Sequence, residues 1–276
     1  MMIKVLSENT AASDEFGCEH GLSLYVETNR HRLLFDTGAS GLFAENAEKL
    51  GVNLSAVDVA VLSHGHYDHG GGLKTFLAKN ERAKVYMQEK AFEPHYSNRL
   101  GGIKADIGLD PALLPNERFV FCKGHQKIDG ELELFSEVRE ITPVPSGNAE
   151  LFQKSGEAFV PDEFAHEQNL VIWQSKRAVL IAGCAHRGIL NIVRQFESDY
   201  GRFPDVVIGG FHLHSRGTGK SESPEAVDAL ARELLQTGAQ YCTCHCTGQE
   251  AYQRLKTVMG TRIGYLSAGS RLAINL

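Results

Sequence analysis

Residues 57–73 read VDVAVLSHGHYDHGGGL and decide what kind of protein this chain can be. The apolar, β-branched run over residues 57–62 predicts a buried strand that ends at Ser63. Four side chains that can bind metal ions then follow within six residues: His64, His66, Asp68 and His69. The stretch therefore predicts a strand that carries metal ligands at its end.

The spacing of these residues indicates how they could share metal ions. His64 and His66 are two residues apart, so an extended backbone points both imidazoles the same way. Asp68 and His69 follow at an expected helix start, where glycines allow a tight turn, and can serve a neighbouring ion or the other side of the same one. Imidazole with carboxylate suits zinc, iron or manganese better than calcium, which prefers oxygen ligands. A merely solvated polar loop would not account for so dense a set of ligands.

Composition narrows the class of protein. The 276 residues are 42% hydrophobic and 22% charged, which is typical of a folded globular protein. The formal net charge of −6 argues against a large nucleic-acid interface, so we expect a small-molecule substrate and no nucleic-acid partner. No apolar run approaches the ~18 residues of a membrane helix and the start lacks a signal-peptide core, so we expect no membrane contact and a cytoplasmic location. The six cysteines lack a small-domain disulfide spacing and are expected to be reduced thiols, while the oligomeric state is not indicated.

The order of expected elements predicts a mixed sheet with covering helices. Strands are expected at residues 3–7, 22–27, 32–35, 57–62, 84–88, 132–141, 170–173, 178–182, 205–210 and 263–267. Helices are expected at residues 42–50, 73–77, 189–196, 225–235 and 249–259. Two strand ends resemble each other, because the strand at 178–182 is also followed by candidate ligands, Cys184 and His186, and by a glycine-started helix.

The run YCTCHC at residues 241–246 places three cysteines around His245. Period-two alternation puts Cys242, Cys244 and Cys246 on one face, away from His245. A structural zinc site would need paired cysteine units that this cluster lacks, so we interpret the three as small buried thiols.

The segment HGHYDH fits the His-x-His-x-Asp-His signature of the metallo-β-lactamase superfamily. The chain resembles the branch named after 7,8-dihydropterin-6-methyl-4-(β-D-ribofuranosyl)aminobenzene 5'-phosphate synthase, which includes metal-dependent hydrolases. The similar blocks are FDTG, SHGHYDHGGG, GCAHRGILNIV, IGGFHL and HCTG, and they extend from Asp36 to Gly248. This resemblance implies the α/β (α+β) class and a four-layer αββα sandwich with a metal site at one edge. It also implies one domain over residues 1–276, with a pocket-forming insertion at about residues 92–127.

The resemblance also implies how the site is built. It assigns His64, His66 and His186 to one metal ion, and Asp68, His69 and His245 to a second. Asp36 would support the metal loop through hydrogen bonds without binding an ion. Many members of the superfamily place a bridging Asp where this chain has Cys184, so Cys184 and His166 are kept as further candidate ligands.

The expected activity follows from this site. Two divalent ions, Zn²⁺ before Mn²⁺ or Fe²⁺, would activate water or polarise a small, phosphorylated or pterin-like substrate. We expect a hydrolase, or a dihydropterin synthase-like transferase that releases diphosphate, with Asp68 and His212 as catalytic residues. The alternatives are a non-hydrolytic iron-binding redox or sensor protein, and a nuclease or phosphodiesterase of the same fold. Candidate substrate or anion contacts are His95, Tyr96, Arg99, Lys104, Arg216 and Lys220.

Overall fold

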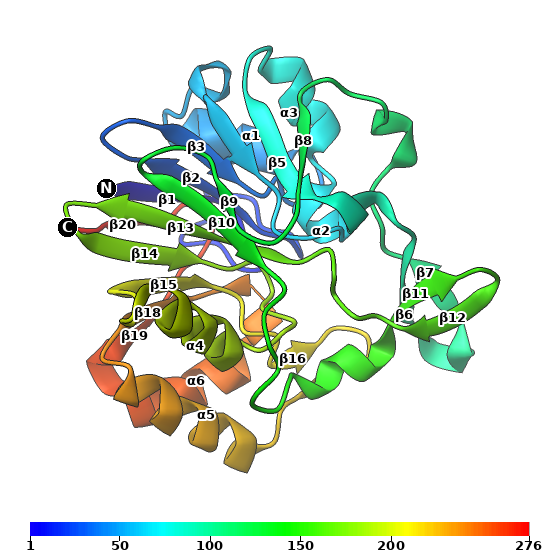
Figure 1. Ribbon diagram of the computed structural model, residues 1–276, viewed down its shortest axis with the longest axis vertical. Helices are drawn as coiled ribbons and strands as arrows, with labels where there is room; N and C mark the ends of the chain where they lie inside the picture. The colour runs from blue at the N-terminus through cyan, green and yellow to red at the C-terminus, as the bar shows by residue number, and fades with distance from the viewer. Residues whose placement is uncertain (276) are drawn as a thin grey trace.

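Two seven-stranded sheets packed face to face form the centre of the computed structural model, which describes residues 1–275 (Figure 1). In spatial order, the first sheet consists of β20 (Arg271–Ala273), β1 (Met2–Ser7), β2 (Ser23–Glu27), β3 (Arg32–Phe35), β4 (Val59–Val61), β5 (Lys84–Gln88) and β8 (Phe119–Cys122). The second consists of β19 (Ile263–Tyr265), β18 (Gln240–Thr243), β15 (Val206–Gly209), β14 (Arg177–Ile181), β13 (Gln168–Gln174), β10 (Leu132–Ser136) and β9 (Gln126–Lys127).

Helices cover the outer face of each sheet (Figure 1). The helices α1 (Leu42–Lys49) and α3 (Leu73–Lys79) pack on the first sheet, and the one-turn helix α2 (Tyr67–Gly70) precedes α3. The second sheet is covered by α4 (Ile189–Tyr200), α5 (Pro224–Gln236) and α6 (Gln249–Met259). The order helix, sheet, sheet, helix confirms the predicted αββα sandwich.

The alternation of apolar side chains explains why each sheet is buried on both faces. In β3, Leu33 and Phe35 enter the core between the sheets, while Leu34 packs under the helices. In β14, Val179 and Ile181 face the first sheet, while Leu180 packs under α4 and its neighbours. Continuous apolar strands of this kind bury both faces, which is typical of a sheet between two layers.

The direction of the strands determines where the loops gather. In the first sheet β3, β4, β5 and β8 run parallel, and in the second β14, β15, β18 and β19 do so. The carboxyl ends of parallel strands meet at one edge of a sheet, and loops there commonly form binding sites. The six residues assigned to the two ions follow such strand ends, so the fold brings them to one edge, whereas the further candidate His166 precedes β13.

A smaller sheet projects from one side of the sandwich, at the right of Figure 1. Its order is β12 (Ala158–Pro161), β11 (Leu151–Ser155), β6 (His95–Asn98) and β7 (Lys104–Asp106). A two-stranded ribbon, β16 (His214–Ser215) with β17 (Lys220–Ser221), lies near it. Residues 92–127, predicted as a pocket-forming insertion, therefore contribute β6 and β7 to the smaller sheet and then return to the first sheet as β8.

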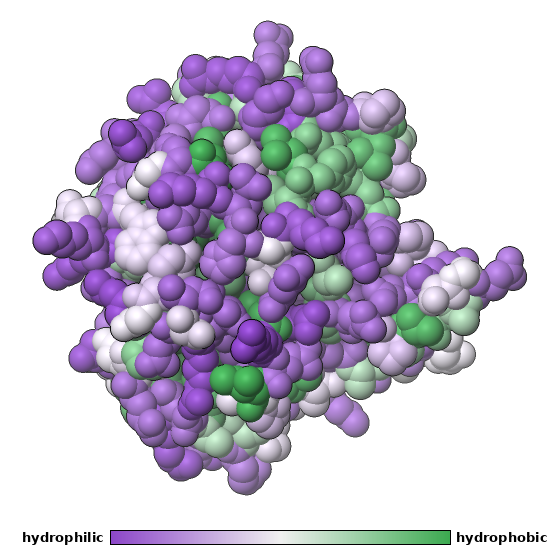
Figure 2. Space-filling model, in the orientation of Figure 1, coloured by the Kyte–Doolittle hydropathy of each residue, from purple (hydrophilic) through white to green (hydrophobic). Residues whose placement is uncertain are grey.

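Short 3-10 helices complete the chain. They are η1 (Leu54–Ala56), η2 (Glu89–Phe92), η3 (Leu100–Gly102), η4 (Pro111–Leu113), η5 (Ser146–Glu150), η6 (His245–Thr247) and η7 (Gly260–Arg262). Within residues 1–275, every helix is too short or too polar to cross a membrane. Figure 2 shows that the face of the molecule in view is mostly hydrophilic, with a few apolar areas.

Several predicted strands are shorter than expected, and in two of them a left-handed residue explains the difference. The strand predicted at 132–141 ends at Ser136, because Glu137 adopts a left-handed φ of 58° that a strand cannot contain. The extended run inferred for 241–246 ends at Thr243, and His245, with a φ of 49°, begins a 3-10 turn. The period-two argument for the cysteines was therefore wrong beyond Thr243. Cys242 and Cys244 do pack between the sheets, but Cys246 lines a pocket.

Candidate metal centre

All six side chains predicted to bind metal lie together at the edge where the parallel strands end. The rings of His64, His66 and His186 form one group. Their centroids are 4.6 Å apart for His64 and His66, 5.0 Å for His64 and His186, and 5.1 Å for His66 and His186. The loop after β4 and the loop after β14 therefore meet.

The second predicted group is also assembled. Candidate ligand atoms of Asp68, His69, His245 and Cys184 all lie within 4.8 Å of one another. Oδ2 of Asp68 is 3.3 Å from Nε2 of His245 and 3.7 Å from Nε2 of His69. The two groups occupy one continuous buried region, since the rings of His64 and His69 are 4.1 Å apart.

Unpaired ring nitrogens are the strongest sign of metal binding here. Within residues 1–275, the Nε2 atoms of four buried histidines have no hydrogen-bond partner: His64, His66, His186 and His245. A buried polar atom without a partner costs about 1–3 kcal/mol, so four in one place require an explanation. Metal ions would supply it, because each imidazole could then donate its lone pair to an ion.

The protonation of these rings is compatible with that role. Burial, reinforced by neighbouring imidazoles, lowers the pKa of His64, His66 and His186 well below the usual value, so the rings are neutral. Burial also lowers the pKa of His69, but the carboxylates of Asp36 and Asp68 outweigh it and raise the pKa to about 9. An ion that binds His69 would therefore displace a proton.

The other ring nitrogen of several ligands is held by a neighbour. Nδ1 of His69 is 2.6 Å from Oδ2 of Asp36, and Nδ1 of His64 is 2.8 Å from the Ser63 hydroxyl. Nδ1 of His186 is 3.1 Å from Oδ1 of Asn148, and Nδ1 of His245 is 2.7 Å from Oδ1 of Asn9. Such contacts fix the ring and leave Nε2 to bind an ion.

Asp36 has the surroundings expected of a supporting residue. Its carboxylate accepts hydrogen bonds from the backbone N–H and the hydroxyl of Ser63, both at 2.7 Å, as well as contacting His69. Asp36 has a left-handed φ of 58°, which Asp tolerates better than most residues. Asp36 follows the end of β3 and contacts residues 63–69, which carry the first donors.

The structure distinguishes between the two further candidate ligands, His166 and Cys184. Both ring nitrogens of His166 are engaged, because Nδ1 accepts the N–H of Gly65 at 2.9 Å and Nε2 is 3.2 Å from Oδ2 of Asp162. Cys184 is buried and its Sγ is 3.2 Å from Nε2 of His69. Burial raises the pKa of Cys184 well above its usual value, so only a bound ion would remove its proton. The geometry therefore favours Cys184 over His166 as a ligand.

The carboxyl group of Asp68 is held in its ionised form. Burial alone would raise its pKa, but His69, His20 and His245 outweigh that effect and keep the pKa well below the usual value. Nε2 of His20 is 3.3 Å from Oδ2 of Asp68. The sequence did not single out His20, because it lies in an irregular loop with no motif around it.

His212 lies beside the donors. Its ring centroid is 4.3 Å from that of His186, and Nδ1 is buried without a hydrogen-bond partner in the described part of the chain. The residue has a left-handed φ of 50°, and its backbone N–H donates to Sγ of Cys246 at 3.3 Å. An uncommon backbone conformation next to a pocket is often associated with function.

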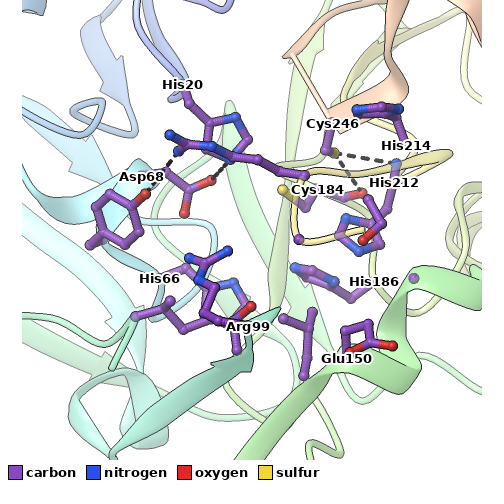
Figure 3. Close-up of a pocket in the computed structure, with 18 residues that line it drawn as sticks. His20, His66, Asp68, Arg99, Glu150, Cys184, His186, His212, His214 and Cys246 are labelled. Atoms are coloured by element: carbon purple, nitrogen blue, oxygen red, sulfur yellow. Dashed lines mark hydrogen bonds and ion pairs between the residues drawn. The ribbon is translucent and has the colours of Figure 1, made fainter. Parts of the chain in front are cut away.

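A pocket borders the donors (Figure 3). His66, Asp68, Cys184 and His186 surround its hollow, and Arg99 and Glu150 also line it. The pocket is lined by these six residues together with His20, Tyr67, Ser97, Ile107, Gly147, Leu151, His212, His214, Ser215, Arg216, Gly217 and Cys246. The wall thus combines cations, hydroxyls and some apolar surface.

Two of the six predicted substrate contacts line this pocket, Arg99 and Arg216. Nη1 of Arg216 donates to the Tyr67 hydroxyl at 3.0 Å. The other four lie elsewhere: His95 is buried against Asp162, Tyr96 packs on Phe159, Lys104 lies over the ring of Phe152, and Lys220 belongs to β17. The smaller sheet still contributes Ser97 and Leu151 to the wall.

Several supporting residues were not predicted. Glu167 accepts the backbone N–H of His186 at 2.6 Å and that of Arg187 at 3.1 Å. Glu8 accepts the backbone N–H of His245, and η5 supplies Asn148. These residues are far from the ligands in sequence, so a motif search has no signal for them.

Comparisons with known proteins agree with this geometry. A family model described as the metallo-beta-lactamase superfamily matches residues 16–194. An uncharacterized protein of Methanocaldococcus jannaschii, MJ0448, is 31% identical over 96% of this chain and 98% of its own length. The same organism's 7,8-dihydropterin-6-methyl-4-(beta-D-ribofuranosyl)-aminobenzene-5'-phosphate synthase is 26% identical over 90% of this chain and 88% of its own length. The solved structure of Tm1679, described as a metal-dependent hydrolase of the beta-lactamase superfamily, is 30% identical with a TM-score of 0.83, covering 99% of both chains.

Proposed function

The chain belongs to the metallo-beta-lactamase superfamily, and on this premise we propose that it is a metal-dependent hydrolase of small phosphorylated molecules. The observation that carries the proposal is that one pocket is lined by four candidate donors, His66, Asp68, Cys184 and His186, and by two arginines, Arg99 and Arg216. Guanidinium groups match the charge and the oxygen spacing of phosphate. A phosphoryl group would therefore lie between the arginines and the donors.

The donor set fits two divalent metal ions, with Zn²⁺ preferred and Mn²⁺ or Fe²⁺ as alternatives. His64, His66 and His186 would hold one ion, and Asp68, His69 and His245 the other. Bound ions of this kind make hydroxide available near neutral pH and polarise a phosphoryl oxygen.

The chain's own residues would position the reacting groups. The Asp68 carboxylate lines the pocket, where it can orient a water molecule by accepting a hydrogen bond from it. His212 lies next to His186 on the pocket wall, where its ring can donate a hydrogen bond to a departing oxygen. Ile107, Leu151 and Tyr67 give the rest of a substrate an apolar and aromatic surface.

Steady-state kinetics of the zinc-loaded protein test this proposal. We expect phosphoesters to be hydrolysed, and uncharged lactones or thioesters of similar size to react more slowly. Charged hydrogen bonds contribute about 1.5–3 kcal/mol, so Arg99→Ala and Arg216→Ala should each raise KM for a phosphoester roughly 10-fold or more. Lys220→Ala is the matched control, because Lys220 is a nearby cation that does not line the pocket in the part of the chain described. An unchanged kcat/KM in Arg216→Ala, or faster hydrolysis of uncharged substrates, would contradict the proposal.

A second candidate is transfer of the dihydropterin synthase type. It is supported by the 26% identical relative, whose named product contains a pterin and a 5'-phosphate. The same arginines could bind that phosphate, and the apolar wall could contact an aromatic ring. Incubation with the diphosphate ester of a hydroxymethyl dihydropterin and a phosphorylated aminobenzene riboside, followed by mass spectrometry, distinguishes condensation, which releases diphosphate, from hydrolysis.

A further inference from the structure

Cys184 occupies a place between the two groups of metal donors. Its Sγ belongs to one set of mutually close candidate ligand atoms with Asp68, His69 and His245, and to another with His64 and His186. In each set the atoms lie within 4.8 Å of one another. A single sulfur atom is thus near every donor group that the site offers.

The backbone around Cys184 holds the sulfur in this place. A Cβ on the preceding residue, Gly183, would lie 2.2 Å from Oγ of Ser63 and 3.1 Å from Nδ1 of His64. The chain just after β14 therefore packs directly against Ser63 and His64, and only glycine allows so close an approach. The Cys184 carbonyl also accepts a hydrogen bond from the Cys246 thiol at 3.5 Å.

We propose that Cys184 binds both metal ions through one shared thiolate. The inference rests on the metal centre of the proposed function, and not on its substrate. On binding, the thiol proton passes to solvent and the sulfur forms one bond to each ion. A shared thiolate would favour zinc, cobalt or iron over magnesium and manganese, because soft sulfur ligands select these metals.

Cys246 is the neighbouring thiol and the natural control. Its Sγ accepts the backbone N–H of His212, and its set of close candidate ligands contains only Cys184 and His212. It does not share a set with the histidines of either donor group among residues 1–275. Of the two thiols, we therefore assign Cys184, and not Cys246, as the ligand of the two-ion site.

Zinc-edge X-ray absorption on the zinc-loaded full chain counts the sulfur neighbours of each ion. In protein that elemental analysis shows to hold two zinc ions per chain, a shared thiolate gives about one sulfur per zinc near 2.3 Å, whereas a thiolate on only one of the two ions gives about half. We expect about one in the native protein and in Cys246→Ser, and none in Cys184→Ser. Cys184→Asp should bind as much zinc as the native protein but show no sulfur, because a carboxylate can also bridge two ions.

Three results would overturn the proposal. They are about half a sulfur per zinc in the native protein, a loss of half the sulfur in Cys246→Ser, and a Cys184→Ser protein whose sulfur signal is unchanged. Circular dichroism of each variant shows that it is folded, and Cys184→Asp keeps the test decisive if Cys184→Ser is unstable. Zinc and sulfur are counted without any substrate. A protein inactive on phosphoesters can therefore still confirm the thiolate, and an active one can still refute it.

Discussion

Two buried histidine clusters lie side by side in this molecule and differ in one respect. The donor cluster contains the histidines of the metal centre with Asp68 and Cys184. The closed cluster consists of His95, Asp162 and His166, and it approaches the donor cluster through His66, whose ring centroid is 5.1 Å from that of His166. Both clusters bring histidine and carboxylate atoms within 4.8 Å of one another, so both could hold an ion by proximity alone.

Hydrogen bonding separates the clusters. In the closed cluster, Asp162 contacts Nδ1 of His95 at 3.0 Å and Nε2 of His166 at 3.2 Å, and Nδ1 of His166 accepts the N–H of Gly65. In the donor cluster, four Nε2 atoms have no such partner within residues 1–275. Unpaired Nε2 atoms, and not closeness alone, therefore distinguish His64, His66, His186 and His245 from the closed cluster. The closed cluster instead positions Gly65, the residue between His64 and His66.

The largest difference should appear when the same substitution is made in each cluster. His186→Asn removes a ligand, so we expect metal content to fall and kcat/KM to fall at least ~1,000-fold. In His166→Asn the Asn oxygen can still accept the Gly65 N–H, so metal content should remain near the native value. Elemental analysis and steady-state kinetics give both quantities. Equal metal loss in the two variants would contradict the distinction between the clusters.

The sequence predicted the donors of the first loop better than the rest of the site. His64, His66, Asp68 and His69 follow one strand within six residues, so local spacing was sufficient. His186 and His245 were assigned through resemblance, because their partners come from strands far apart in the chain. Asn9, His20, Asn148 and Glu167 were not predicted, since only the folded chain brings them to the ligands.

The fold shows the same division between local and long-range information. Helix 249–259 was predicted with the bounds that the structure shows, because its apolar period and the preceding Gly248 are local signals. The smaller sheet was not predicted, since β6 pairs with β11 from a distant part of the sequence. Cys246 was placed on the wrong face because a left-handed residue, His245, ends the alternation.

His212 tests whether a pocket histidine outside the two predicted groups of ligands acts on the substrate. We expect His212→Ala to lower kcat roughly 100-fold while metal content stays native, because a hydrogen bond to the departing oxygen contributes about that much. Turnover and elemental analysis are measured on one preparation. Loss of metal in this variant would instead make His212 a ligand and would enlarge the donor cluster.

Asn148 tests the support of a single ligand. Its amide accepts from Nδ1 of His186 at 3.1 Å and donates to the His186 carbonyl at 2.8 Å. Asn148→Ala should weaken zinc affinity about 10-fold, because contacts of this kind orient the ligand. Competition with a zinc chelator measures the change. Asn148→Asp retains an acceptor and should restore most of the affinity; equal weakening in both variants would contradict an orienting role.

His31 offers the smallest effect, at the opposite edge of the sandwich. As in the closed cluster, both ring nitrogens of His31 have a partner, which here is a carboxylate oxygen. Nδ1 is 3.1 Å from Oδ1 of Asp58, and Nε2 is 2.7 Å from Oδ2 of Asp129. Burial lowers the pKa of His31, but the hydrogen bonds to Asp129 and Asp58 outweigh it and raise the pKa above its usual value. The stabilising contribution is therefore present below about pH 6.5 and is lost as the pH rises through the raised value.

Thermal unfolding of His31→Ala checks this linkage. We expect a loss of about 1 kcal/mol or less at pH 5.5 and a smaller loss at pH 9, because partly exposed carboxylates are screened by solvent. Metal content should not change at either pH. A larger loss at pH 9 than at pH 5.5 would show that the charged pairs do not stabilise the fold.

Elemental analysis of protein purified without added metal tests the metal centre most directly, with His64→Ala and His186→Ala measured alongside. The account predicts about two ions per chain, zinc before manganese, and a lower content in both variants. Iron in place of zinc would favour the redox or sensor alternative. A native protein that retains no transition metal, or variants that retain as much as the native protein, would contradict the assignment of the donor cluster.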